Sequence, residues 1–311
     1  MKTIDIGKQG LYGSELILGC MRINALNVDE ADHLIMNAYN AGINMFDHSD
    51  VYGGGRCEEL FGEVLLNHKE LRDKIIIQSK CGIAKNADGK ITHFDFSKEH
   101  ILKSVDASLS RLKVDYLDTL LLHRPDTLME PEEVADAFDT LYTSGKVKHF
   151  GVSNQNVRQI ELLKTCVRQP LSINQMQMSI TECGMIAQGL NTNMTNKLSY
   201  MHEDGVLEYS RINNMTLQAW SPFQIGFFEG TFIDNPAFEE LNNCLQKHAE
   251  RFGVAKTAVA VAWILRHPAK MQVIVGTTYY RHLNEILGFE KVELSREDWY
   301  EIYRSAGHTL P

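Results

Sequence analysis

Eight short apolar runs, rich in β-branched residues, alternate along the chain with longer stretches of helical periodicity. Runs that are apolar on both faces are typical of parallel strands buried beneath helices. Eight strand–helix units in 311 residues predict an α/β protein with the (β/α)8 or TIM-barrel fold, a closed parallel eight-stranded barrel with outer helices. The runs are LILGCM (16–21), INMFD (43–47), KIIIQSK (74–80), DTLLLH (118–123), VKHFGVSN (147–154), LSINQMQ (171–177), TLQAWSP (216–222) and MQVIVGT (271–277).

Three of the intervening segments carry clear helix signals. The segment 29–42 ends on a glycine, 97–112 opens with Ser97 as a capping residue, and 131–145 has a proline in its first turn and a glycine at its end. An open doubly wound sheet is the alternative, but the LGCMRIN that follows the first run lacks the glycine-rich dinucleotide loop.

The domain organisation is simple, because no linker or break in composition interrupts the chain. We therefore expect residues 1–311 to form a single domain. The first residues, TIDIGKQGLYGSEL, read as an N-terminal β-hairpin that closes one end of the barrel.

Charge and hydropathy exclude some partners. The net charge is −9 and no Lys/Arg run is present, so we expect no nucleic-acid partner. No apolar stretch reaches the roughly 20 residues of a membrane span. The N-terminus alternates polar and apolar residues without the apolar core of a signal peptide, which predicts a cytoplasmic protein. Nothing in the sequence indicates the oligomeric state.

Polar residues capable of chemistry or ligand binding end most of the runs. In a parallel barrel the carboxyl ends of the strands meet at one face, where active sites are found. Each residue alone has an ordinary structural explanation, such as a solvated lysine or a hydrogen-bonded core histidine. Taken together they predict one site at that face, built from Asp47, Lys80, His123, Ser153, Asn154, Gln175, Trp220 and Gly276.

At these residues the sequence resembles the aldo-keto reductases. The stretch NMFDHSDVYGGGRCEELFG (44–62) is similar to the signature of that family, with Asp47, Tyr52, Glu58 and Gly62 at matching places. The resemblance continues through SKCG, LLLHRPD, GKVKHFGVSN, INQMQ, AWSP and VIVGTTYYRHLNE, in the order of the family. It implies an enzyme, an NAD(P)H-dependent oxidoreductase that reduces an aldehyde or ketone to the alcohol.

The resemblance implies a catalytic tetrad of Asp47, Tyr52, Lys80 and His123. Tyr52 is the implied general acid, and the Lys80 ammonium is expected to lower the pKa of the phenol, which is about 10 when free. Asp47 is expected to hold the lysine. We expect Tyr52 and His123 to contact the substrate. His48 stands where the family usually has a small residue, and we expect it to contact the substrate as well. The roles of His48 and Asp50 in catalysis are left open.

The resemblance also implies a nicotinamide cofactor. Arg281 remains available for a 2′-phosphate, so we expect NADP(H), with NAD(H) as the alternative, although TTYY replaces the stretch in which many relatives have a lysine. No ligand spacing supports a metal site at His48, Asp50 and His123, so none is expected. The implied cofactor contacts are Ser153, Asn154, Gln175, Trp220, Ser221, Gly276, Thr277, Thr278 and Arg281.

Two other functions fit part of the pattern. A lysine that ends a barrel strand is also found in aldolases that form a Schiff base, which would use Lys80. Some barrels of this family resemble ion-channel accessory subunits that bind cofactor with little turnover. The implied substrate is a small-molecule carbonyl compound, and the sequence does not say which one.

Overall fold

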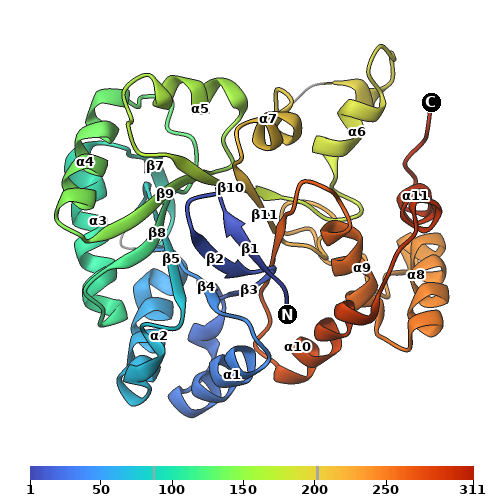
Figure 1. Ribbon diagram of the computed structural model, residues 1–311, viewed down its shortest axis with the longest axis horizontal. Helices are drawn as coiled ribbons and strands as arrows, with labels where there is room; N and C mark the ends of the chain where they lie inside the picture. The colour runs from blue at the N-terminus through green and yellow to red at the C-terminus, as the bar shows by residue number, and fades with distance from the viewer. Residues whose placement is uncertain (87, 201–202) are drawn as a thin grey trace.

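Eight parallel strands form a closed barrel in the computed structural model, which describes residues 1–86, 88–200 and 203–311 (Figure 1). Each strand pairs with the next barrel strand along the chain, and the last pairs with the first. Each of the eight predicted runs overlaps a barrel strand, which confirms the (β/α)8 prediction. The strands are β3 (Leu16–Gly19), β4 (Met45–Asp47), β5 (Ile76–Cys81), β8 (Leu117–Leu122), β9 (Val147–Ser153), β10 (Leu171–Gln177), β11 (Thr216–Trp220) and β12 (Gln272–Val275).

The helices surround the barrel, and α8 and α11 lie outside α9 at its edge (Figure 1). The three predicted helices are present, and Ser97 caps α3 by accepting a hydrogen bond from the amide of His100. No helix among the described residues is both long and apolar enough to cross a bilayer. The helices are α1 (Val28–Asn40), α2 (Arg56–Asn67), α3 (Lys98–Leu112), α4 (Pro131–Thr143), α5 (Val157–Lys164), α6 (Gly184–Leu190), α7 (Val206–Ile212), α8 (Glu239–Phe252), α9 (Lys256–Leu265), α10 (Tyr280–Leu287) and α11 (Arg296–Ser305).

The predicted N-terminal hairpin closes the amino end of the barrel. It consists of the antiparallel strands β1 (Thr3–Ile6) and β2 (Leu11–Ser14), which lie across the barrel in Figure 1. The side chain of Ile6 is fully buried in the apolar cluster inside the barrel. The amide of Gly7 donates to Thr216 Oγ1 at 3.0 Å, which ties the hairpin to β11. The hairpin therefore covers the amino end of the barrel, and the carboxyl end is left as the accessible face.

Buried glutamines form a polar layer inside the barrel above the apolar cluster. Gln78 Nε2 donates to Gln218 Oε1 at 2.8 Å, and Gln218 Nε2 donates to Gln272 Oε1 at 3.0 Å. All three side chains are fully buried. Buried amides must find hydrogen-bond partners, and this layer satisfies them by joining β5, β11 and β12.

Two segments beyond the regular strand–helix units extend from the carboxyl end. The hairpin of β6 (Ile83–Lys85) and β7 (Ile91–Phe94) follows β5 and was not expected from the sequence. The loop 221–235 follows β11 and precedes α8. Both contribute residues to the cavity described below.

Gly62 allows α2 to approach α3 closely. A Cβ atom at this position would lie 2.3 Å from the carbonyl oxygen of Arg111 and 2.8 Å from the carbonyl carbon of Leu112. One turn earlier, the buried carboxylate of Glu58 accepts from Arg111 Nη2 at 2.6 Å and from Ser79 Oγ at 2.6 Å. The EELFG segment thereby fixes α2 against both α3 and β5.

We predict that Gly62→Ala destabilises the protein by about 2–3 kcal/mol or more, because the added methyl group meets backbone atoms that cannot turn away. Urea unfolding followed by circular dichroism measures the change. Gly189→Ala in α6 is the control, since its Cβ would be no closer than 3.5 Å to the nearest atom, Glu208 Oε1. Equal stability of the Gly62 variant and the wild type would contradict the role assigned to this glycine.

Candidate active site

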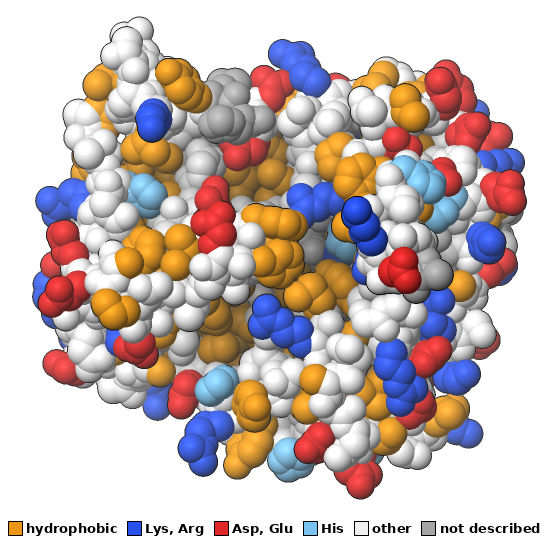
Figure 2. All heavy atoms as spheres, turned by 180° about the vertical axis from the view of Figure 1, so that it is seen from behind, with side chains coloured by type: hydrophobic (Ala, Val, Ile, Leu, Met, Phe, Trp, Pro, Cys, Tyr) orange, Lys and Arg blue, Asp and Glu red, His pale blue; other side chains and the backbone are white. Residues whose placement is uncertain are grey.

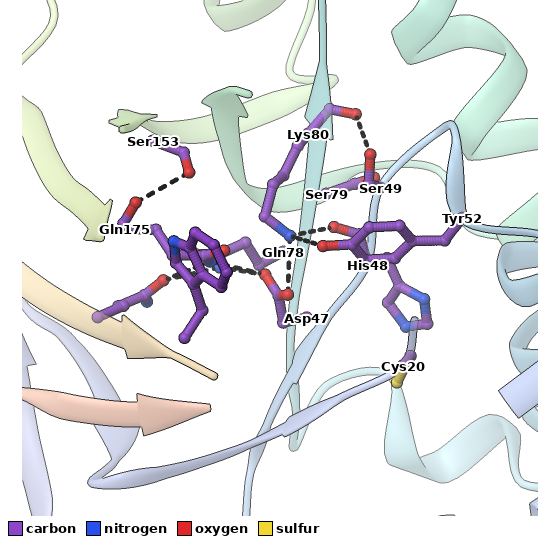
Figure 3. Close-up of polar contacts among 12 residues, drawn as sticks. Cys20, Asp47, His48, Ser49, Tyr52, Gln78, Ser79, Lys80, Ser153 and Gln175 are labelled. Carbon is purple, nitrogen blue, oxygen red and sulfur yellow. Dashed lines mark hydrogen bonds and ion pairs between the residues drawn. The ribbon is translucent and has the colours of Figure 1, made fainter. Parts of the chain in front are cut away.

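Lys80 is the buried cation around which the site is arranged (Figure 3). Its ammonium group donates to Asp47 Oδ2 at 2.7 Å, to the carbonyl oxygen of His48 at 2.7 Å and to the hydroxyl of Tyr52 at 3.0 Å. An ammonium has three donors, and all three are used. Burial alone would lower the pKa of Lys80, but Asp47 and Tyr52 outweigh it and hold the pKa above its ordinary value. The lysine is therefore charged at neutral pH.

Asp47 is held in place by the glutamine layer. Its Oδ1 atom accepts from Gln78 Nε2 at 2.6 Å and from Gln175 Nε2 at 3.0 Å, while Oδ2 faces Lys80. The carboxylate is nearly fully buried, at 2% exposure. A buried carboxylate is tolerable only when it is paired and hydrogen-bonded, and here both oxygens have partners.

The glycines after Tyr52 turn the chain from β4 into α2. Tyr52 opens a short 3-10 helix (Tyr52–Gly55), in which Gly53, Gly54 and Gly55 have φ angles of 56°, 65° and 96°. Left-handed values of φ strongly favour glycine over other residues. This turn brings the phenol back over the end of β4, where its hydroxyl meets Lys80.

The pKa of Tyr52 is raised above its ordinary value, mainly by burial, although the Lys80 charge opposes the shift. The net direction is opposite to the expectation that Lys80 would lower the pKa. Burial raises the pKa because it removes the phenolate from water. The Lys80 ammonium offsets this effect only in part, because it is also paired with Asp47. Tyr52 consequently keeps its proton through neutral pH.

His123 faces Tyr52 across the end of β8. The two rings meet edge to face, with 5.9 Å between their centroids. Burial, with Lys80 and Arg124 nearby, holds the pKa of His123 well below its usual range, so the imidazole is neutral. Its Nδ1 atom lies 3.0 Å from Ser49 Oγ, which leaves Nε2 as the second polar atom of the ring.

Ser49 also links His123 to Asp50. Ser49 Oγ lies 3.1 Å from Asp50 Oδ1, so one hydroxyl connects the imidazole to a carboxyl group. Burial, reinforced by the neighbouring Glu58, raises the pKa of Asp50 to about 7. Asp50 is thus connected to His123 through the hydroxyl of Ser49.

A cavity of about 840 Å³ opens above these residues. Figure 2 shows this face as a central hollow, with hydrophobic side chains and several Lys and Arg side chains around it. Lys80 is buried below the cavity and does not line it. The lysine donates a hydrogen bond to the hydroxyl of Tyr52, which does line the cavity. The predicted residues that line the cavity are Asp47, Tyr52, His123, Ser153, Asn154, Gln175, Trp220, Ser221 and Gly276.

His48 lies outside the cavity, which argues against the predicted contact with substrate. Its side chain is fully buried, and its ring packs edge-on against Phe61 of α2 with 4.5 Å between centroids. Neighbouring side chains on a strand point to opposite faces. Because Asp47 points into the barrel, His48 must point out toward the helices. Burial, with Lys80 nearby, lowers the pKa of His48 to about 3, so the ring is neutral.

Four of the predicted cofactor residues form one hydrogen-bonded wall. Ser153 Oγ donates to the carbonyl oxygen of Gln175 at 2.9 Å, and Asn154 Nδ2 donates to Ser153 Oγ at 2.8 Å. Trp220 Nε1 donates to Asn154 Oδ1 at 3.1 Å, which fixes the indole at the cavity wall. These contacts join β9, β10 and β11 beside Tyr52.

Ser221 and Gly276 also line the cavity, whereas Thr277, Thr278 and Arg281 lie beyond its lining. Thr277 Oγ1 accepts from the amide of Tyr279 at 3.1 Å, just before α10 begins. Arg281 is exposed in the first turn of that helix, and Thr278 is partly buried beside it.

Several residues that support or line the site were not predicted from the sequence. Gln78 and Gln218 hold Asp47 and Gln175, and Arg124 lines the cavity next to His123. A glutamine in the middle of an apolar run was the available signal for the first two. Phe94 and Phe228 line the cavity from segments that carry no strand-end signal.

Comparisons with known proteins agree on one family. Residues 15–306 match the model described as the aldo/keto reductase family. Over the full length of both chains the protein is 34% identical to the uncharacterized oxidoreductase YcsN of Bacillus subtilis and 32% identical to the oxidoreductase YdhF of Escherichia coli. It is 36% identical to a 6-dehydroglucose reductase of Agrobacterium fabrum over 85% of this chain and 84% of that one.

One solved structure shares the fold. The crystal structure of the thermostable aldo-keto reductase Tm1743 superimposes with a TM-score of 0.79 at 24% identity, covering 98% of this chain and 100% of that one.

We predict that Lys80→Met destabilises the protein by about 3–5 kcal/mol, because it leaves Asp47 buried without its cation. The double variant Asp47→Asn/Lys80→Met should recover part of that loss, since it removes both charges. Urea unfolding of the three proteins measures the differences. A double variant less stable than Lys80→Met would contradict the pairing.

Proposed function

The chain belongs to the aldo/keto reductase family, and from that premise we propose that it reduces an aldehyde or ketone to the alcohol with NADPH, using Tyr52 as the general acid. The family and the fold make the protein an oxidoreductase of a carbonyl-reducing class. The observation that carries the finer proposal is the Tyr52 hydroxyl, which lines the cavity 3.0 Å from Lys80 Nζ.

Tyr52 supplies the proton in this proposal. Because the phenol oxygen already accepts from Lys80, its own hydrogen is free to point into the cavity toward a carbonyl oxygen. As that proton leaves, the phenolate that forms lies beside a fixed ammonium, which stabilises it without rearrangement. A pKa raised by burial keeps Tyr52 protonated at neutral pH, the state that reduction requires.

His123 and Asp47 act in support. A neutral imidazole with Nδ1 held by Ser49 presents Nε2 to the cavity, where it orients the carbonyl oxygen beside the phenol. Asp47 keeps Lys80 in place and charged.

The residues of the cavity wall fit a nicotinamide. Trp220 offers a flat ring held by Asn154, and Gln175 and Asn154 offer amide groups. A Cβ atom at Gly276 would meet no protein atom closer than 3.9 Å, so a side chain there would fill space that the glycine leaves open. A bound nicotinamide supplies the hydride that reaches the carbonyl carbon. The phosphate contacts proposed for Gly276, Thr277, Thr278 and Arg281, and the cofactor contact proposed for Ser221, rest on the resemblance.

The Schiff-base alternative is not favoured. A nucleophilic lysine must lose its proton, whereas the pKa of Lys80 is raised and its three donors are used. A cofactor-binding accessory subunit would use the same site and differ only in turnover, so an assay of turnover decides between the two. The cytoplasmic location remains a prediction. The substrate that we propose is a small carbonyl compound.

We predict that Tyr52→Phe lowers turnover by about 10²–10⁴-fold or more, while NADPH binding changes little, because only the acidic hydroxyl is removed. The assay follows NADPH consumption with a panel of aldehydes and ketones that includes 6-dehydroglucose, the compound named for one relative. Tyr12→Phe, at a tyrosine that is 59% exposed, is the matched control and should match the wild type. Wild-type-like turnover by Tyr52→Phe would refute its role as the acid.

We predict that Arg281→Ala weakens NADPH binding by about 1.5–3 kcal/mol, the usual contribution of a charged hydrogen bond, and leaves NADH binding nearly unchanged. NADH lacks the 2′-phosphate that the guanidinium would bind. Quenching of tryptophan fluorescence measures both affinities, with Trp220 in the cavity as the reporter.

Arg168→Ala is the control for this measurement, because Arg168 is 85% exposed on a different loop. Equal losses for both cofactors, or none for either, would exclude a 2′-phosphate contact at Arg281.

A further inference from the structure

We propose that Arg124 binds an anionic group of the substrate, so that the cavity selects aldehydes or ketones that carry a carboxylate or another oxyanion on an apolar body. This inference rests on the proposed function, because it concerns the compound that is reduced at Tyr52. It is drawn from the position of one arginine and the chemistry of the cavity walls.

Arg124 is a half-buried cation that forms no ion pair with any carboxylate of the residues that the structure describes. Its guanidinium carbon lies 5.5 Å from the centroid of the Trp220 ring and 5.3 Å from that of Phe227. Burial lowers the pKa of Arg124, and Tyr52 opposes this shift.

Two other arginines that are mostly buried show the contrast. Arg111 lies 2.6 Å from Glu58 and Arg72 lies 2.9 Å from Asp118, so each has a buried carboxylate as its partner. Burying a guanidinium without an anion is costly, and proteins ordinarily avoid it by pairing. Arg124 instead lines the cavity, where a ligand can supply the missing anion.

The charge of the cavity favours an anion. Its lining includes Arg22, Lys85 and Arg124. Among the described lining residues the one carboxylate is that of Asp47, which is already paired with Lys80. The chain as a whole carries a net charge of −9, so this positive lining is opposite in sign to the rest of the molecule. A cleft of one sign raises the local concentration of ligands of the other sign.

The other cavity walls are apolar and aromatic. Phe94 and Ile91 come from the β6–β7 hairpin, and Phe227 and Phe228 come from the loop after β11. These side chains suit a ring or an alkyl chain rather than a polyhydroxylated body. The preferred substrate therefore combines an apolar body, a reducible carbonyl near Tyr52 and an anion near Arg124.

A phosphate of the cofactor is the other possible source of an anion, but the topology favours the substrate. Arg124 follows β8, whereas the proposed phosphate segment begins at Gly276, directly after β12. In the closed barrel these two strands lie on opposite sides, four positions apart in the strand order. The guanidinium is also near Tyr52, the proton donor.

The test compares two aldehydes of the same shape, 4-carboxybenzaldehyde and 4-methylbenzaldehyde, at saturating NADPH. We expect the wild type to show a kcat/KM at least about tenfold higher for the carboxylated compound, since a charge-assisted hydrogen bond distinguishes the two. In Arg124→Gln this ratio should fall to near one, and Arg124→Lys should restore part of it. Arg168→Gln, on an exposed arginine elsewhere, should keep the wild-type ratio.

The outcomes separate the two proposals. If the wild type reduces neither aldehyde nor any other carbonyl compound of the panel, the proposed function fails. If it reduces them with a ratio near one, or prefers uncharged 6-dehydroglucose, the anion site is refuted and the reductase stands. If Arg124→Gln keeps the wild-type ratio but weakens NADPH binding in fluorescence titration, Arg124 binds the cofactor and the inference is overturned.

Discussion

The buried ammonium of Lys80 is the constraint on which the site depends. A charge inside the barrel is tolerated only if three acceptors converge on it, and Asp47, the His48 carbonyl and Tyr52 are those acceptors. This requirement fixes the register of β4 against β5, where Asp47 pairs with Gln78. It also fixes the path of the chain after β4, because Tyr52 must return over the strand end. A local electrostatic demand therefore sets the position of the proposed acid.

The buried glutamines extend the hydrogen bonds of Asp47 through the interior of the barrel. Asp47 accepts from Gln78 and Gln175, both of which donate to Gln218, and Gln218 donates to Gln272. Gln272 in turn donates to the carbonyl oxygen of Ser14 in the N-terminal hairpin. A continuous set of hydrogen bonds thus connects the hairpin that closes one end to the charged pair at the other. Such a network loses more than one hydrogen bond when any member is removed, because each neighbour is left buried and unsatisfied.

The sequence predicted the barrel because apolar runs of strand length mark buried strands. Asp47, Lys80 and His123 were selected because they end such runs, whereas Tyr52 came only from the resemblance to the family signature. The sequence did not place His48 correctly, although strand alternation contained the answer: a residue next to an inward-pointing Asp47 must point outward. The expected lowering of the pKa of Tyr52 is opposite to the direction found, since burial and charge act in opposite directions and only the three-dimensional arrangement determines which is larger. The β6–β7 hairpin and the aromatic loop after β11 lack periodicity, so their part in the cavity was also unpredictable.

Charge is separated by depth in this cavity. The two groups that would face a carbonyl oxygen, Tyr52 and His123, are both neutral at physiological pH, because burial raises the pKa of one and lowers that of the other. The fixed positive charge lies behind them at Lys80, and a second lies beside them at Arg124. In the proposed reaction the proton leaves Tyr52 toward negative charge that develops on the substrate, and the phenolate that remains is stabilised by the Lys80 ammonium. With Tyr52 as the proposed acid, reduction would therefore begin with the proton already on the phenol, which is the state that its raised pKa maintains.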